Sequence, residues 1–441
     1  MDTQEKQGTP QKALLLNLDG TVFGSFAEIG AGQEVARWFL RVGGASGTVA
    51  KTISAYDKEV SDDLYGAGTR YVSKPRLQAM LESEWEQLRG QLQATRGATT
   101  RFFSFVDTIS ARNFSGTNEC HGWVGLRFLQ QPGGPSNDVI LHINLRDPSN
   151  VQQQEAVGIL GVNLLYAAQH ALASPEDFLA SVLEDLSLER LELDCVEFEG
   201  PVFEKWDRQE VHALLVTRGY AEAVVFPADN NLAPPTELLY KRALVLAPGR
   251  FGNVERLHAD LIRITLAELP AEELKESKGG LGLFCLSAAP GGAELKSLPT
   301  AEIVTLVATL QKMGYGVMLF RAPELYLMSA FVNRYTKLRI HFAIGLSVLV
   351  HVLENQYKDL PGSLLEGIAR LFAQNVRLCV YPMPVAEVEH RVKEARLTGW
   401  HWKETNGIVY ANDLHPEKPL DFLYQYLLSE FLILPSKAAL G

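Results

Sequence analysis

The chain has few residues that could stabilise it through disulfides or metal ions. Four cysteines occur in 441 residues, and none are spaced as Cys-x-x-Cys. Disulfide frameworks and zinc ribbons need closely spaced pairs, so neither is expected. The ten histidines form neither His-x-His nor His-Glu-x-x-His, so no metal site is predicted. Because scattered cysteines suit a reducing compartment, we expect a cytoplasmic protein.

Long apolar runs and clusters of positive charge are also missing. The most apolar segment, residues 342–353, is shorter than the roughly 20 residues that cross a bilayer. Residues 1–11 lack the basic and apolar regions of an export signal, and we expect a disordered tail there. The formal net charge is -11, and Lys and Arg form no run. We therefore predict no membrane partner and no nucleic-acid partner.

Nucleophilic motifs are incomplete. No Gly-x-Ser-x-Gly elbow occurs, so acyl transfer by serine is not expected. Residues 14–21 resemble the Asp-x-Asp-Gly-Thr signature of haloacid dehalogenase phosphatases, but Asn17 stands where the nucleophilic aspartate belongs. An amide cannot replace an ionised carboxylate as nucleophile or hard-cation ligand, so that chemistry is not expected either.

The composition is that of a globular protein large enough for two domains. Apolar residues make up 46% of the chain and charged residues 21%. The order of apolar segments predicts a mixed-sheet α/β domain over residues 12–199 and a doubly wound, largely parallel α/β domain over residues 200–441.

Apolar periodicity predicts the elements of the first domain. Expected strands are residues 13–18, 102–109, 123–128, 139–145 and 191–198, and expected helices are residues 33–42, 75–97, 151–172 and 175–186. A Pro-Gly-Gly-Pro turn predicts an antiparallel hairpin between the third and fourth strands.

Strands and helices alternate in the second domain, which favours a parallel sheet. Expected strands are residues 223–226, 243–246, 281–286, 317–320, 338–344 and 378–381, and expected helices are residues 208–218, 254–269, 301–313, 346–356, 363–374 and 385–397.

Glycine is concentrated between Phe23 and Lys74, where two glycine-rich loops flank a short amphipathic helix. Glycine lets the backbone approach an anion, and a helix N-terminus carries partial positive charge. We therefore expect the loop at Gly30–Gln33 to cradle a phosphate or carboxylate.

Known cofactor motifs match this stretch only in part. Residues 27–32 resemble the first motif of S-adenosylmethionine-dependent methyltransferases, but Glu34 occupies the position of a glycine. A dinucleotide motif would need glycine at Val35, and a P-loop would need Lys51 directly after Gly47. The cofactor stays unidentified, and a structural turn with a helix cap is the alternative interpretation.

Charged residues near these loops supply the candidate site. The candidates for proton transfer or catalysis are Glu28, Lys51, Asp57 and His121, and the ligand-binding candidates are Gly30, Gly32, Gln33, Glu34, Arg70 and Arg112. Further acids at residues 192, 194, 197 and 199 alternate along a strand, which places Glu192 and Asp194 on one face and the other two on the opposite face. We interpret this as a solvated edge strand.

Residues 16–37, 50–57 and 70–73, with residues 119–123 and 158–164, resemble a family of uncharacterised bacterial proteins. Its members are variously labelled nicotinate-nucleotide adenylyltransferase or TonB-dependent receptor. The first label implies nucleotidyl transfer to nicotinate nucleotide, which would be expected to use His-x-Gly-His, a motif absent here. The second implies an exported barrel of many short lipid-facing strands, which the predicted buried helices do not fit.

The sequence therefore predicts a cytoplasmic protein that binds an anionic or nucleotide-like small molecule at its N-terminal glycine-rich loops, with the reaction unidentified. One alternative is a non-catalytic assembly or regulatory protein, a homo-oligomer in which the small residues pack against a second subunit. Another is nucleotidyl transfer, as the family resemblance implies.

Overall fold

The computed structural model describes residues 7–30, 32–68, 70–249, 256–289, 298–354, 357, 359–394 and 399–436. The chain forms two compact units, Met1–Ala221 and Glu222–Gly441. The domain boundary expected from sequence, at residue 200, lies about twenty residues before this division. A helix, α1 (Thr9–Leu18), begins within the segment 1–11 that was expected to be disordered. Each unit is described by itself below.

The first unit contains a six-stranded sheet. Its strands are β1 (Val22–Gly30), β2 (Val49–Ile53), β3 (Arg101–Ser110), β4 (His121–Leu129), β5 (Ser136–Leu145) and β6 (Leu191–Glu199). Its remaining helices are α2 (Val35–Val42), α3 (Lys58–Tyr65), α4 (Lys74–Arg96), α5 (Asn150–His170), α6 (Pro175–Val182) and α7 (Arg208–Thr217), with short 3-10 turns η1 (Ala45–Gly47) and η2 (Pro201–Phe203).

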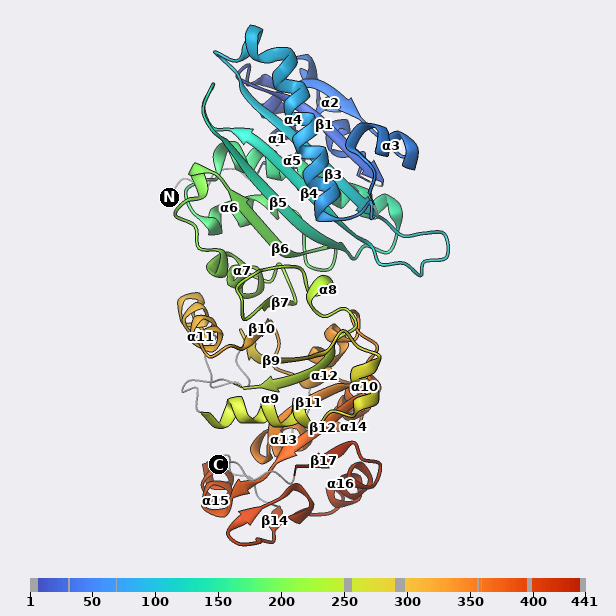
Figure 1. Ribbon diagram of the computed structural model, residues 1–441, viewed down its shortest axis with the longest axis vertical. Helices are drawn as coiled ribbons and strands as arrows, with labels where there is room; N and C mark the ends of the chain where they lie inside the picture. Colours follow the sequence, from blue (N-terminus) through green and yellow to red (C-terminus); the bar gives the residue numbers. More distant parts are fainter. Residues whose placement is uncertain are drawn as a thin grey trace. The chain divides into compact units, whose positions relative to one another are not determined.

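The sheet is mixed, as the sequence predicts. Its strand order is β2-β1-β3-β4-β5-β6. Strand β1 pairs in parallel with both β2 and β3, whereas β3 to β6 pair in antiparallel fashion, including the predicted β4–β5 hairpin. Helix α4 packs across β1, β3 and β4, and α1, α2, α5 and α6 form a layer behind the sheet as drawn in Figure 1.

Each face of this sheet has its own core. On the α4 face, Leu77, Met80 and Leu81 pack against residues of β1, β3 and β4 such as Val106 and Trp123. On the opposite face an aromatic cluster joins β1, β3 and α2, in which the Phe26 ring lies 5.1 to 6.0 Å from those of Phe39, Phe103 and Phe105. The sheet is therefore covered on both sides near β1.

Two expectations for the first fifty residues are wrong. Residues 13–18, expected as a strand, lie in α1, where Pro10 stands in the first turn and Lys12, Ala13 and Leu16 are buried at helical spacing. Residues 22–30, expected as the start of a glycine-rich loop, form β1 in the interior of the sheet. Because β1 is buried on both faces, it lacks the alternation that marks a half-exposed strand.

The second unit is built on a seven-stranded sheet. Its strands are β7 (Ala223–Phe226), β8 (Ala243–Pro248), β9 (Gly280–Ser287), β10 (Gly316–Phe320), β11 (Ile340–Gly345), β12 (Val376–Tyr381) and β17 (Ile433–Pro435). Short pairs are formed by β13 (Met383–Pro384) with β15 (Ile408–Val409) and by β14 (Trp400–Trp402) with β16 (Leu414–Pro416). The helices are α8 (Pro235–Leu238), α9 (Arg256–Glu268), α10 (Ala271–Lys275), α11 (Thr300–Lys312), α12 (Leu325–Val332), α13 (Leu346–Glu354), α14 (Ser363–Phe372), α15 (Val385–Glu394) and α16 (Leu420–Ser429), with a 3-10 turn η3 (Ala411–Asp413).

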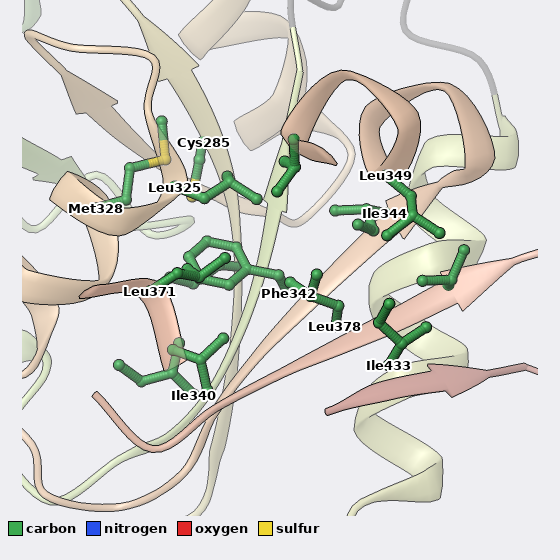
Figure 2. Packing of buried hydrophobic residues seen from close by; sticks show 14 of the residues in the cluster. Cys285, Leu325, Met328, Ile340, Phe342, Ile344, Leu349, Leu371, Leu378 and Ile433 are labelled. Atoms are coloured by element: carbon green, nitrogen blue, oxygen red, sulfur yellow. The ribbon is translucent and has the colours of Figure 1, made fainter. Parts of the chain in front are cut away.

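The sheet of the second unit is largely parallel, which confirms the predicted doubly wound fold. Its order is β17-β12-β11-β8-β9-β10-β7, and only β7 runs antiparallel to its neighbour. Figure 2 shows Phe342 of β11 at the centre of the core, with Met328 of α12 and Leu371 of α14 on the same side. Ala243, Val245 and other residues on the opposite face pack with α9.

None of the helices in the described ranges has the length and apolar character needed to cross a membrane.

Close packing between α5 and α2 depends on a glycine. A Cβ on Gly161 would lie 2.3 Å from a methyl carbon of Val35 and 3.0 Å from the Phe105 ring. We predict that Gly161→Ala lowers the free energy of unfolding of this unit by about 1–3 kcal/mol, because α5 must move outward. The matched control is Gly90→Ala in α4, where a Cβ would meet nothing within 4 Å and a gain of roughly 0.5–1 kcal/mol is expected. Urea unfolding measures both variants, and equal effects would contradict this packing argument.

Candidate functional site

Some of the candidate residues, including Gly30 and His121, lie at one edge of the sheet in the first unit. Strands β1 and β3 are parallel, with Gly30 opposite Ile109 at their carboxyl ends. The next strands continue this edge, since Ser110 pairs with His121 and His121 with Asn144. In open α/β sheets ligands bind outside the carboxyl ends of parallel strands. We refer to this edge of the sheet, from Gly30 to Asn144, as the carboxyl edge.

The glycine-rich turn joins β1 to α2 at this edge. Gly30 has φ +81°, a left-handed conformation that favours glycine. The Gln33 side-chain amide donates to the Gly30 carbonyl over 3.0 Å, and the Glu34 N–H donates to the Gly32 carbonyl. The turn is therefore held mostly by its own hydrogen bonds.

The start of α2 already binds a carboxyl group, the side chain of Glu28. The N–H groups of Val35 and Ala36 donate to the two Glu28 carboxyl oxygens over 2.8 and 3.1 Å. A carboxylate at a helix N-terminus satisfies open N–H groups and matches the helix dipole. An exogenous anion at these two amides would have to displace Glu28.

A second buried acid lies beside Glu28. Asp107 is directly opposite it on β3, is fully buried, and has no hydrogen-bond partner for either carboxyl oxygen among the described residues. Gly32 covers this carboxyl so closely that a Cβ would lie 2.0 Å from Oδ1. Burial, and then the Glu28 carboxyl, raise the pKa of Asp107 well above its ordinary value. Burial raises the pKa of Glu28 to about 7, against the two helix N–H groups that lower it.

The loop before α4 brings a cation to the carboxyl edge. The Thr108 hydroxyl donates to the Tyr71 carbonyl over 2.7 Å, which fixes this loop over the end of β3. Arg76 anchors it from α4 by donating to the Gly66 carbonyl and pairing with Asp62. Arg70 is exposed, lowers the pKa of His121 by its charge, and has no ion-pair partner within the ranges the structure describes.

His121 is the first member of a buried hydrogen-bonded row. Its Nδ1 lies 3.2 Å from Nε2 of His142, whose Nδ1 lies 2.6 Å from Oδ1 of Asp194. The Asn144 amide donates to Oδ2 of the same carboxylate over 2.7 Å. The Trp123 ring packs 4.8 Å from the His142 ring. Burial, and then the neighbouring His142, lower the pKa of His121 to about 4, so His121 is neutral at pH 7.

The expected solvated strand is wrong for two of the four acids of β6, whereas Glu197 is partly exposed and Glu199 exposed. Glu192 and Asp194 are 0% and 2% exposed, and Glu192 pairs with Arg146. The strand does lie at the sheet edge, but its register shifts between His142 and Ile143, and Asp194 lies at this irregularity. A bulge of this kind redirects a side chain, here toward His142. Simple alternation could not foresee it.

The other candidates have structural partners. Lys51 is in the middle of β2 and pairs over 2.7 Å with the buried carboxylate of Glu84, so it does not lie at the carboxyl edge. Asp57 caps α3 by accepting from two backbone N–H groups. Arg112 donates to the Pro148 carbonyl, and Glu34 pairs with Arg37.

The sequence reasoning missed His142 and Asn144, and it assigned Asp194 to a solvated edge strand. His142 and Asn144 are two residues apart on β5 and so share one face, which is the signal that the sequence did contain. Their partner on β6 is set by the bulge, for which the sequence carries no comparable signal. Among the described residues, no group of three or more His, Cys, Asp or Glu side chains is arranged to hold a metal ion.

Comparisons with known proteins give partial structural matches only. No protein-family model matches the chain, and no curated protein does. The competence/damage inducible protein CihA from Agrobacterium tumefaciens matches at 19% identity and a TM-score of 0.26, over 37% of this chain and 96% of that one. A competence or damage-inducible protein from Enterobacter asburiae matches at 13% identity and 0.27, over 37% and 99%. A CinA superfamily protein from Enterobacter cloacae matches at 11% and 0.27, over 38% and 96%.

The acid pair predicts that stability falls as pH rises. A carboxyl with a higher pKa in the folded state than in the unfolded chain binds more protons when folded, so the free energy of unfolding falls between about pH 4.5 and pH 7. For Glu28 the loss is on the order of 3 kcal/mol. We predict that Asp107→Asn reduces the total loss, because burial and the Glu28 carboxyl raise the pKa of Asp107 as well.

Urea midpoints at pH 5, 6, 7 and 8 measure this dependence. The control is Asp63→Asn, an exposed carboxyl on α3 that should keep the dependence of the unsubstituted protein. An Asp107→Asn protein that loses as much stability toward pH 8 as the unsubstituted one would disprove the coupling of the pair.

Proposed function

We propose that the Met1–Ala221 unit binds a small anionic or nucleotide-like molecule at the carboxyl edge, between its glycine-containing loops and the start of β4. The observation that carries this proposal is the position of Arg70. It is an exposed cation without an ion-pair partner in the described part of the chain, and the next residue, Tyr71, accepts through its carbonyl from the Thr108 hydroxyl at the end of β3 over 2.7 Å. A guanidinium at the carboxyl end of parallel strands suits a phosphate or carboxylate.

The glycine-rich turn at Gly30 would border the proposed site, but its amides would not bind the anion. Gly30 packs so closely on β3 that a Cβ would lie 2.2 Å from the Ile109 carbonyl oxygen, and this packing holds the turn at the end of β1. The amides of Val35 and Ala36 are used by Glu28, so the ligand charge is assigned to Arg70. The chemical class is that of a phosphate or carboxylate monoanion or dianion, which includes nicotinate nucleotide.

A second candidate function is assembly into a homo-oligomer. Leu14, Leu15 and Leu18 of α1 are 37%, 43% and 69% exposed, and Leu40 of the adjoining α2 is 55% exposed. Exposed apolar side chains on neighbouring helices favour contact with a second protein surface. A rise of thermal stability with protein concentration, in the absence of any ligand, would support assembly.

Removing the Arg70 charge tests the ligand site. Inorganic phosphate, adenosine monophosphate and nicotinate mononucleotide are each titrated while thermal unfolding is followed. We predict saturable stabilisation by at least one of them, and a roughly 10- to 100-fold weaker apparent affinity for Arg70→Ala, since a charge-assisted hydrogen bond contributes about 1.5–3 kcal/mol.

The matched control is Arg89→Ala, which removes the same charge from an exposed position on α4. Its ligand response should equal that of the unsubstituted protein. The proposal is rejected if none of the three anions stabilises the protein, or if Arg70→Ala and Arg89→Ala respond alike.

A further inference from the structure

With Asp194 ionised and His142 neutral, the hydrogen bonds of the buried row behind His121 allow one arrangement of hydrogens. An ionised Asp194 can only accept, so the His142 Nδ1 that lies 2.6 Å away carries the hydrogen. A neutral His142 then has its lone pair on Nε2, which must accept from Nδ1–H of His121 over 3.2 Å. His121 is left with a lone pair on Nε2, for which no hydrogen-bond partner is present among the described residues. The row therefore presents a base.

The surroundings hold this arrangement in place. His142 is fully buried and Asp194 is 2% exposed, whereas His121 is half-buried. The Asn144 amide occupies the second oxygen of Asp194, and the Trp123 ring packs against His142. These contacts limit rotation of both side chains. His142 and Asp194 are thus closed to a ligand, whereas His121 is partly exposed.

We propose that His121 is the proton acceptor of the carboxyl edge, and that His142 and Asp194 are the positioning residues that hold its Nε2 lone pair toward the bound molecule. The proposal rests on the ligand site proposed above. In the step, the X–H bond of an acidic O–H or N–H group of the anion breaks, its electron pair stays on X, and the Nε2 lone pair forms the new N–H bond. The products are imidazolium and the deprotonated ligand.

The charges that face His121 suit this step. Arg70 lowers the pKa of His121 by its charge, and Asp194 raises it. A ligand anion beside Arg70 would offset the Arg70 charge, so the bound state would favour proton uptake on Nε2. The imidazole is thus in the free-base form before binding and becomes a stronger base once the anion is present.

The reactivity of Nε2 can be measured without knowing the substrate. Diethyl pyrocarbonate modifies the free-base nitrogen of histidine, and the tryptic peptide of residues 113–127 contains His121 as its single histidine. The rate is measured at pH 7 by mass spectrometry of this peptide, with and without inorganic phosphate. We expect modification at Nε2 and protection by phosphate.

Asp194→Asn tests the positioning residues. An amide at this position can donate to His142 Nδ1, which reverses the row and puts a hydrogen on Nε2 of His121. We expect the rate of modification to fall by roughly tenfold or more, with the same urea midpoint within error as evidence of folding. Asn144→Ala, which removes only the second hydrogen bond to Asp194, provides a milder variant with a smaller fall in rate.

The matched control is Asp138→Asn on β5, whose carboxylate pairs with Arg127 and has no contact with the row. It should leave the rate for His121 unchanged. The inference is overturned if His121 is modified as fast in the Asp194→Asn variant as in the unsubstituted protein, or if the modification is on Nδ1. If phosphate gives no protection but Asp194→Asn still slows the modification of His121, the ligand site is rejected and the role of His121 as a base is retained.

Discussion

Parallel pairing of β1 with β3 is the constraint on which the site depends. It brings the carboxyl ends of both strands to one edge and sets Glu28 opposite Asp107. This register places the turn at Gly30 at the same edge, with the start of α2 bound to the Glu28 carboxyl group. It also places His121, the first residue of β4, beside the end of β3. A slip of β1 by one residue would turn Glu28 to the other face of the sheet, where α4 packs, and separate it from Asp107.

The two faces of this sheet carry different polar groups near the same edge. Glu28 and Asp107 share a buried site that lacks a basic partner in the described residues. The helix amides bind Glu28, and the raised pKa values of both acids tie the stability of this unit to pH. The row of His121, His142 and Asp194 is instead fully hydrogen-bonded inside and open at one end. A buried polar network with one open member is what a proton-transfer site needs.

Much of the fold could be predicted from the sequence, because apolar periodicity reports local structure. The alternation of strands and helices in the second unit, and the antiparallel hairpin of the first, were found this way. Strand β1 was missed since burial on both faces removes the alternation, and Glu28 was therefore assigned to a loop. The candidate list included His121 and Arg70 by loop position, but the role of Asp194 depends on a β-bulge, a tertiary feature that no local pattern encodes.

The central claim is that Asp194, through His142, determines which nitrogen of His121 carries the hydrogen. Long-range ¹⁵N–¹H correlation spectra of the histidine-labelled protein at pH 7 report this directly, since protonated and unprotonated ring nitrogens differ widely in chemical shift. The structure predicts a neutral His121 with its hydrogen on Nδ1 and an unprotonated Nε2. A hydrogen on Nε2, or a doubly protonated ring, would contradict it.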